Sequence, residues 1–229
     1  MLEHRIETHA HTNIVSPCGQ LSPVELVAGY VAAGYSGLIV TDHLVHWLPV
    51  FDGLDSWPDR VHAYFSGYRA ARDAARGTGL TVYPGFELTF ADLPGNDFLV
   101  YGLDEEALVE LPDVYWMEPD SFKRLANAAG ALVFQAHPFR GRGPVDPALL
   151  DGVEVRNGNP RHDSHNDLAA AFASRHQLHE IGGSDAHQAE DIGRAGITVP
   201  EMPETIHELT RWYRDSSDRV GLLVLDPTP

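Results

Sequence analysis

The sequence predicts a mostly parallel α/β barrel with one polar site at the carboxyl ends of its strands. Short apolar runs with the length and β-branched content of strands alternate with segments of helical spacing along the chain. Several of these runs end in histidine or a carboxylate, beginning with His9 and His11, which point to the same face of an extended strand. In an α/β barrel such strand ends meet at one face, where the side chains would form a pocket that binds metal.

Composition limits the class of protein. The length of 229 residues suits one large domain, and no linker-like stretch divides it, so we predict a single domain over residues 1–229. The 16 basic and 33 acidic residues give a formal net charge of −17, which disfavours a general nucleic-acid surface or an anionic membrane as partner. The sequence leaves the oligomeric state open.

The cysteine count and the apolar runs of the sequence predict the cellular compartment. Cys18 is the only cysteine, so no intrachain disulfide can form and a reducing compartment fits. The histidine pair begins close to Met1 and leaves no room for a signal segment. No apolar run approaches the roughly 20 residues of a membrane helix. We therefore expect a soluble, cytoplasmic protein.

Five segments have the spacing and the end signals of helices. The first starts at Pro23 behind the capping residue Ser22 and ends at Gly34. The others are residues 64–76, rich in alanine and closed by Gly77, residues 121–129, closed by Gly130, and residues 167–175 and 203–213.

Strands are predicted before and between these helices. After the opening strand that ends at His11, they cover residues 37–43, 80–87, 98–102, 131–137, 152–155 and 177–182. The short stretch 91–97 is all that joins the strand ending at Glu87 to the next one. A parallel crossover needs a dozen or more residues, so this connection should reverse the chain and place Asp97 beside Glu87.

The long segment 44–58 has two readings. It carries Trp47, Phe51 and Trp57, and a loop of this length in a compact domain is usually functional, which favours a lid or a wall on the substrate side. The alternative is that its aromatic side chains only pack over the barrel rim.

With these residues in view, the chain resembles the PHP (polymerase and histidinol phosphatase) family from His9 to about Thr198. Five motifs match in order and spacing: His9-Ala10-His11-Thr12, Thr41-Asp42-His43, Gly85-Phe86-Glu87, Ala136-His137-Pro138 and Gly183-Ser184-Asp185-Ala186-His187. The resemblance implies a distorted (β/α)7 TIM-like barrel with two or three divalent metal ions, zinc, manganese or iron. It also implies a hydrolase that acts mainly on phosphate esters.

The resemblance also implies which residues bind metal. One metal would be held by His9, His11, Glu87 and Asp185, a second by His137 with Glu87 as a bridge, and a third by His43 and His187. Asp97 stands where many members have a histidine, and we expect it to ligate the second metal. Ser16 and Cys18 lie where many members have an aspartate or histidine for the third metal, so both are candidate substitutes.

Other polar residues are assigned supporting or structural roles. Asp42 is expected to support the site through a hydrogen bond or to be structural, and Glu154 to support the site or to be a surface charge. Cys18 is either a ligand or a small buried apolar residue. The remaining histidines are taken as structural: His4, His46, His62, His162, His165, His176, His179 and His207.

The leading function is a metal-dependent phosphoesterase in which a metal-activated hydroxide attacks a small phosphomonoester or phosphodiester. The predicted catalytic residues are Asp185, which takes the proton, the metal-side His187, and Arg140, whose guanidinium fork suits a phosphate oxygen. Arg156 and Arg194 are weaker phosphate candidates and more typical of surface arginines.

Two other functions remain open. A nuclease acting on oligonucleotide ends would need a local basic groove. A metal-binding regulatory module without turnover would be favoured by the loss of several ligands. The sequence has no Gly-rich phosphate loop and no Gly-x-Ser-x-Gly turn, so it supports neither nucleotide-triphosphate binding nor serine chemistry.

Overall fold

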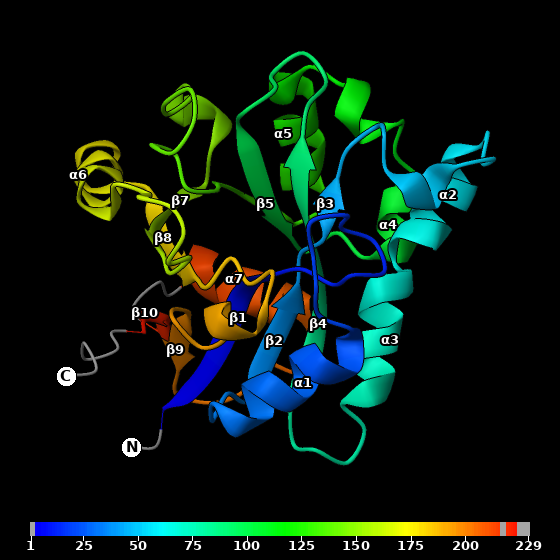
Figure 1. Ribbon diagram of the computed structural model, residues 1–229. Coiled ribbons are helices and arrows are strands. Elements are labelled where there is room, and N and C mark those ends of the chain that lie inside the picture. The colour runs from blue at the N-terminus through cyan, green and yellow to red at the C-terminus, as the bar shows by residue number, and fades with distance from the viewer. Residues whose placement is uncertain (1–2, 216–218, 224–229) are drawn as a thin grey trace.

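A computed structural model of the chain describes residues 3–215 and 219–223 and shows a distorted α/β barrel (Figure 1). Within those ranges the barrel wall consists of β1 (His4–Ala10), β2 (Gly37–Val40), β4 (Thr81–Thr89), β5 (Asp97–Tyr101), β6 (Leu132–Gln135), β7 (Gly152–Asn157) and β8 (His179–Gly183), in this spatial order. The strand β3 (His43–Leu44) pairs with β4, while β9 (Ile197–Val199) and β10 (Gly221–Leu222) extend the sheet beyond β1. The predicted fold class is confirmed.

The barrel nearly closes where the chain leaves β1 and β8. Ala186 donates its backbone N–H to the carbonyl of His9 at 3.1 Å, and His11 donates to the carbonyl of Ala186 at 2.9 Å. A Cβ on Gly183 would lie 2.4 Å from the Cβ of His9, so only glycine allows β8 this close to β1. This junction brings two predicted ligand pairs, one from each strand, to the same place.

One strand runs against the others in the barrel wall. The neighbours β1–β2, β2–β4, β6–β7 and β7–β8 are parallel, whereas β5 is antiparallel to both β4 and β6. The predicted chain reversal is therefore confirmed. Its register differs in detail, because Asp97 pairs with Thr89, and Glu87 pairs with Leu99. Asp97 therefore lies opposite a residue of β4 that is two positions after Glu87.

Seven helices are described outside the barrel wall: α1 (Pro23–Ala32), α2 (Trp57–Tyr64), α3 (Ser66–Ala74), α4 (Glu105–Val109), α5 (Pro119–Ala128), α6 (Asn166–His176) and α7 (Ile206–Asp215). The start of α1 is a capping box in which Ser22 accepts from the N–H of Glu25 and the Glu25 carboxylate accepts from the N–H of Ser22. Gly34 follows with a φ of +76°. All five predicted helices are present, and α2 and α4 were not predicted.

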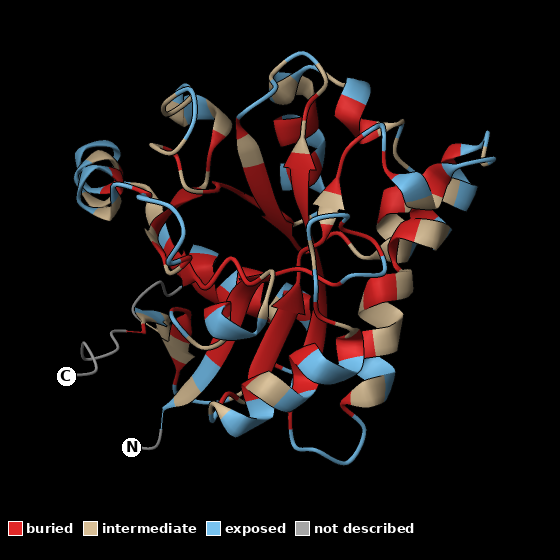
Figure 2. Cartoon of the chain, viewed as in Figure 1, coloured by how far each residue is buried: buried red, intermediate tan, exposed pale blue. Residues whose placement is uncertain are grey.

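The strands are buried almost throughout, and the helices expose their outer faces (Figure 2). A group of phenylalanines fixes β4 against its neighbours: the Phe90 ring meets Phe98 of β5 at 5.3 Å and Phe122 of α5 at 5.6 Å, both edge to face. Phe86, directly before Glu87, has no exposed surface. This packing holds the Glu87 carboxylate on a rigid strand.

The segment 44–58 contains the short 3-10 helix Pro49–Phe51 and leads into α2. Phe51 and Trp57 are buried and pack around Tyr115, at ring distances of 6.5 Å and 5.5 Å. Trp57 also donates its indole N–H to the carbonyl of Leu108 at 3.0 Å. These two aromatic side chains therefore pack over the rim, as the second reading predicted, whereas Trp47 is 63% exposed.

Among the described residues, the helices are all too short or too polar to cross a membrane.

Candidate metal centre

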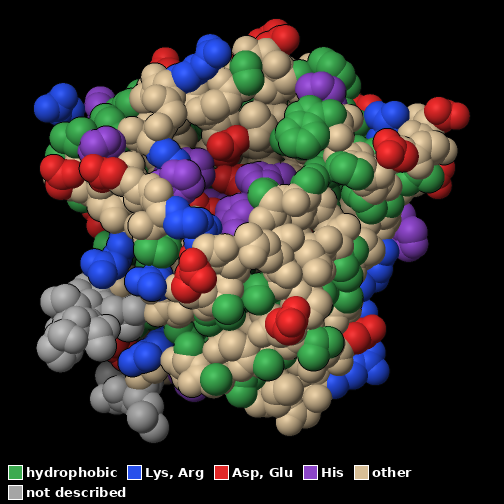
Figure 3. All heavy atoms as spheres, viewed as in Figure 1, with side chains coloured by type: hydrophobic (Ala, Val, Ile, Leu, Met, Phe, Trp, Pro, Cys, Tyr) green, Lys and Arg blue, Asp and Glu red, His purple; other side chains and the backbone are tan. Residues whose placement is uncertain are grey.

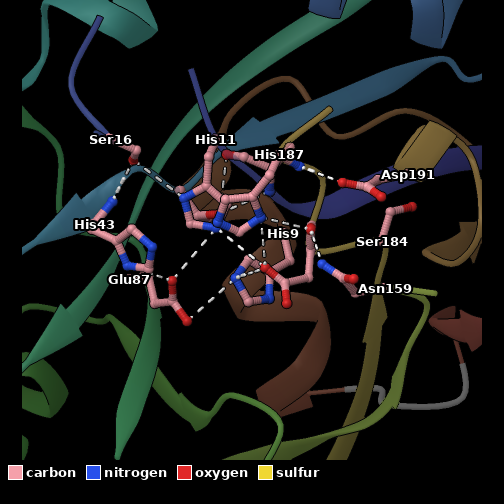
Figure 4. A network of polar contacts seen from close by, with 12 residues as sticks. His9, His11, Ser16, His43, Glu87, Asn159, Ser184, His187 and Asp191 are labelled. Atoms are coloured by element: carbon pink, nitrogen blue, oxygen red, sulfur yellow. Dashed lines mark hydrogen bonds and ion pairs between the residues drawn. The ribbon is translucent and has the colours of Figure 1, made fainter. Parts of the chain in front are cut away.

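The predicted ligands converge in one hollow of the molecule, where histidine, acidic and basic side chains gather (Figures 3 and 4). Each comes from the end of a barrel strand or the residues that follow it. They are His9 in β1 and His11 just after it, His43, which follows β2 and begins the short β3, Glu87 near the end of β4, His137 after β6, and Asp185 and His187 after β8. The site therefore lies at the carboxyl ends of the barrel strands, as predicted.

The ligands form three sets, and within each set the ligand atoms lie no more than 4.8 Å apart. The sets are His9, Glu87 and His137; His9, His11 and Asp185; and His11, His43 and His187. Glu87 stands between the sets. Its Oε1 is 3.3 Å from His9 Nε2 and 3.2 Å from His137 Nε2, and its Oε2 is 2.9 Å from His43 Nδ1. The carboxylate thus lies between imidazoles of different sets, and its role as a metal bridge stays a prediction.

Unsatisfied buried atoms show that these residues fit a metal. Within the described chain, His9 Nε2 and His11 Nε2 are buried and have no hydrogen-bond partner, and Glu87 Oε2 is buried in an ion-pair contact with His43 Nδ1 at 2.9 Å. Leaving such atoms unpaired costs free energy, so they point to a group that binds them. Imidazole nitrogens and carboxylate oxygens at this spacing are the donors that zinc, manganese and iron take from proteins.

Hydrogen bonds orient two of the imidazoles. The Nδ1 of His9 lies 2.9 Å from Glu154 Oε1, and the Nδ1 of His187 lies 3.0 Å from the carbonyl of Asp185. Both partners are acceptors, so each Nδ1 donates the hydrogen bond and each Nε2 is the nitrogen left to bind a metal. Glu154 thus has the supporting role that the sequence suggested.

A second chain of hydrogen bonds orients His11. Ser16 Oγ donates to Asp42 Oδ1 at 2.7 Å and lies 3.3 Å from His11 Nδ1. Since the serine proton is already committed to Asp42, Ser16 accepts from His11 Nδ1–H. His11 Nε2 is therefore free to bind metal, and Asp42 acts on the site through Ser16.

Asp185 is held by one of its two oxygens. Its Oδ2 accepts from Arg140 Nη1 at 2.7 Å and from Asn157 Nδ2 at 3.3 Å. The other Arg140 nitrogen, Nη2, donates to Asn157 Oδ1 at 2.6 Å and to Ser164 Oγ at 2.9 Å. This fixed fork leaves Asp185 Oδ1 facing His9 and His11, each 3.5 Å away.

Electrostatics keep three of the donors, the two carboxylates and His11, in the form that metals bind. Burial raises the pKa of the Glu87 carboxyl, but the charges of His9 and His43 outweigh burial and hold that pKa well below its usual range. The pKa of Asp185 is also well below its usual range, because the nearby imidazoles outweigh burial. Burial, together with the charges of neighbouring histidines, lowers the pKa of His11 well below its usual value. Glu87 and Asp185 are therefore anionic and His11 is neutral at pH 7.

Backbone strain is found at the same place. His137 and Asp185 adopt positive φ angles of 28° and 51°, a region that non-glycine residues rarely occupy. Such strain is retained where the surroundings impose it, which is frequently at functional sites. Both residues follow directly on strands whose ends form the hollow.

The two departures from the family pattern lie at the mouth of the site. Asp97 Oδ1 accepts a hydrogen bond from Thr89 Oγ1 at 2.5 Å, and Asp97 is in none of the three ligand sets. Its ligand role stays a prediction. Cys18 is exposed, so the interpretation as a buried apolar residue is wrong. Burial opposes ionisation of its thiol, but hydrogen bonds with His187 and His43 lower the pKa to about 6.

A cavity of about 370 Å³ opens over the ligands and is lined by Cys18, His43, Asp97, His137, Arg140 and Asp185, among others. His162 and Arg161 also line it, and the sequence analysis missed both. They follow the carboxyl end of β7 as other site residues follow their strands, which is the signal that could have identified them. Neither Arg156 nor Arg194 lines this cavity.

A larger cavity, about 730 Å³, lies between α3, α4 and the start of α7 and contains none of the predicted ligands.

Comparisons with known proteins agree with this architecture. The model of the PHP-associated family matches residues 163–215. A two-domain protein from Bacteroides vulgatus, described as containing a predicted PHP-like metal-dependent phosphoesterase, superposes with a TM-score of 0.68 at 19% identity. The chain has the PHP fold. That match covers 97% of this chain and 65% of the Bacteroides protein, so the chain spans just under two thirds of the length of that relative.

Two other solved structures match over almost the whole chain. PsfC from Pseudomonas syringae has a TM-score of 0.65 at 18% identity, over 98% of this chain and 93% of its own. A lesion-specific endonuclease from Pyrococcus furiosus has a TM-score of 0.63 at 14% identity, over 96% of this chain and 58% of its own. No curated protein matches the chain. At these identities the likeness establishes the fold and leaves the substrate to chemical argument.

Proposed function

We propose that the protein is a metal-dependent phosphoesterase that hydrolyses a small phosphomonoester or phosphodiester. The observation that carries this proposal is the convergence of two buried, unpaired imidazole nitrogens, His9 Nε2 and His11 Nε2, with the buried Glu87 carboxylate beneath an open cavity. Divalent metals bound by these atoms would lower the pKa of a bound water and neutralise the phosphate.

The chain's own groups would orient the phosphate. Arg140 reaches the cavity with Asp185, Asn157 and Ser164 as partners, and these three bonds leave two N–H groups uncommitted, the buried Nε–H and one on Nη1. The Nη1 N–H is available to a phosphate oxygen, as predicted for Arg140. The same guanidinium holds Asp185, so it would align the ester with the carboxylate.

Asp185 and His187 would handle the attacking water. Asp185 Oδ1 points to the ligand side and can accept a hydrogen bond from that water. Because the pKa of Asp185 is well below its usual range, the carboxylate would stay anionic and orient that water as a hydrogen-bond acceptor. His187, which lines the cavity and contacts Asp185, completes the proposed catalytic set.

Cavity size and charge favour a small ester. A volume of about 370 Å³ lies at the small end of ligand pockets, which run from about 300 to 1,000 Å³. Basic side chains border only one side of the hollow (Figure 3), and the net charge is −17. A nuclease acting on oligonucleotide ends is the second candidate, supported by the structural likeness to the Pyrococcus endonuclease.

An activity screen tests the proposal. Protein reconstituted with zinc, manganese or iron would be assayed against phosphomonoesters, phosphodiesters and short oligonucleotides. The variant Glu87→Gln would be assayed in parallel as the protein with a damaged metal centre. We expect hydrolysis of a small ester by the wild type and its loss in the variant, together with loss of metal. Turnover of oligonucleotides alone would favour the nuclease. Full metal loading without turnover of any substrate would favour a regulatory module.

A further inference from the structure

Arg161 is a second guanidinium at the hollow, and the proposed catalytic set does not use it. It lines the same cavity as Arg140, and its side chain is 35% exposed. Both of its Nη atoms donate to the carboxylate of Asp191, Nη1 to Oδ1 and Nη2 to Oδ2, the latter at 2.9 Å. The position of Asp191 therefore sets the orientation of the Arg161 fork.

Asp191 is a rigid anchor for that fork. It has no exposed surface, and its Oδ2 also accepts from the backbone N–H of His187 at 2.9 Å and from that of Gln188 at 3.0 Å. Figure 4 shows the contact between Asp191 and His187. The same carboxylate thus joins the Arg161 guanidinium to the turn that carries a predicted metal ligand.

Two asparagines fix the backbone of Arg161 relative to Arg140. The N–H of Arg161 donates to Asn159 Oδ1 at 3.0 Å, and the N–H of Asn159 donates to Asn157 Oδ1 at 3.1 Å. Asn157 Oδ1 also accepts from Arg140 Nη2 at 2.6 Å. The two guanidinium groups are therefore held in one hydrogen-bonded frame on the wall of the cavity.

The Arg161 fork keeps donors for a further acceptor. The bonds to Asp191 use one N–H on each Nη atom, so Nε–H and the other N–H of each Nη have no partner in the part of the chain that the structure describes. A planar guanidinium with fixed N–H groups suits the oxygens of a carboxylate or a phosphate. Because Asp191 balances the charge of Arg161, we expect these directed N–H groups to matter more than net charge.

We infer that Arg161 binds a second anionic group of the substrate, a carboxylate or a further phosphate, while Arg140 and the metal centre hold the phosphate that is cleaved. The inference rests on the proposed phosphoesterase function and narrows its substrate class to small esters with two anionic groups. The cavity of about 370 Å³ is small for a ligand pocket, so a short linker would join the two groups.

Phosphonate binding to the zinc-reconstituted protein tests the inference without turnover. The probes are short alkylphosphonates that end in a methyl group, a carboxylate or a second phosphonate, and their carbon–phosphorus bond replaces the ester that would be cleaved. Calorimetry gives the affinity of each probe. We expect the wild type to bind the anion-ended probes about tenfold more tightly than the methyl-ended probe, because a hydrogen bond to a charged group contributes about this factor.

The ratio of the two affinities within one protein is the readout for each variant. Arg161→Gln should abolish the preference for an anionic end, and Arg161→Lys, which lacks the planar fork, should recover only part of it. Arg194→Gln is the matched control, because Arg194 is exposed and does not line the cavity, and it should keep the full preference. Comparing the carboxylate-ended and phosphonate-ended probes identifies which anion the site takes.

The outcomes separate this inference from the proposed function. Equal affinity of the wild type for all probes would overturn the role of Arg161, and so would a preference that persists in Arg161→Gln or is lost equally in Arg194→Gln. These results leave the phosphoesterase proposal to the activity screen. Metal-loaded protein that shows the preference but hydrolyses no ester in that screen would overturn the proposed function, and the anion subsite would stand.

Discussion

Glu154 illustrates how a buried residue beside the ligands sets their chemistry. It accepts from His9 Nδ1 at 2.9 Å and from the N–H of His137 at 2.9 Å, and none of its surface is exposed. Its charge favours the tautomer of His9 that presents Nε2 to the metal. Glu154 therefore affects two ligands without lying among the sets that bind the metal.

Replacing Glu154 with glutamine should weaken metal binding. The amide keeps the shape but removes the charge, and loss of such a partner typically costs about 10–100-fold in metal affinity or activity. Competition with a fluorescent zinc chelator would measure the change. Glu180→Gln, on an exposed position of β8, is the matched control and should bind as the wild type does. Equal affinities in both variants would remove Glu154 from the centre.

Variants of Asp97 can distinguish a metal ligand from a residue that only accepts a hydrogen bond. If its carboxylate ligates the second metal, Asp97→Asn should weaken that metal and Asp97→His should retain it. If it only accepts the hydrogen bond from Thr89, both variants should keep the metal and lose only stability. Metal equivalents per chain, counted after dialysis, distinguish the two results.

The sequence could predict which residues converge and two of those that support them, Asp42 and Glu154, but not the supporting roles of Ser16 and Asn157. His9, His11 and His137 are recognisable because each stands in a motif at a strand end. Ser16 and Asn157 carry no such signal, since their roles depend on partners 26 and 28 positions away, Asp42 and Asp185. Only the folded chain shows that Ser16 is already engaged and that Cys18 is not buried.

At the scale of elements, the junction of β1 and β8 depends on one glycine. A Cβ on Gly183 would lie 2.4 Å from His9 Cβ and 2.9 Å from Glu154 Oε1. We expect Gly183→Ala to cost about 1–3 kcal/mol in the free energy of unfolding and to displace His9, weakening metal binding as well.

The neighbouring Gly182 provides the comparison for that variant. Its nearest obstacle is the Gly196 carbonyl oxygen at 3.1 Å, so Gly182→Ala should disturb the junction less. Urea unfolding and zinc affinity would be measured on both. A Gly183→Ala protein as stable and as tightly metal-bound as Gly182→Ala would show that the close approach is unimportant.

The two tryptophans of segment 44–58 differ in burial, so replacing them should change stability by different amounts. Trp57 is 7% exposed and packs edge to face on Tyr115, so Trp57→Ala should cost about 3–5 kcal/mol. Trp47 is 63% exposed, and Trp47→Ala should change stability by no more than about 0.5 kcal/mol. Urea midpoints would check both values. A large loss in Trp47→Ala would show that Trp47 packs in solution.

Elements with local signals were predictable, and those made by tertiary pairing were not. Ser22, Pro23 and Gly34 mark both ends of α1 in the sequence itself. The three-residue strand β9 exists because His4 to Ile6 pair with it antiparallel, and no local pattern records that partner. The helix predicted over 64–76 begins at Ser66, because the chain from Trp57 to Tyr64 forms a separate helix, α2.

At the scale of the molecule, the barrel brings ligands far apart in sequence to one place. Strands β1, β4, β6 and β8 each deliver at least one predicted ligand, and β3 delivers His43. Two carboxylates and five imidazoles are packed together in a largely buried space. A divalent metal centre accounts for this arrangement, because the same groups would otherwise be left with unpaired buried atoms.

Counting metal per chain tests this central claim most directly. Elemental analysis of purified protein, and of protein stripped and then reconstituted with zinc, manganese or iron, should give at least two equivalents per chain. Protein that contains no metal as purified and takes up none on reconstitution would contradict the account.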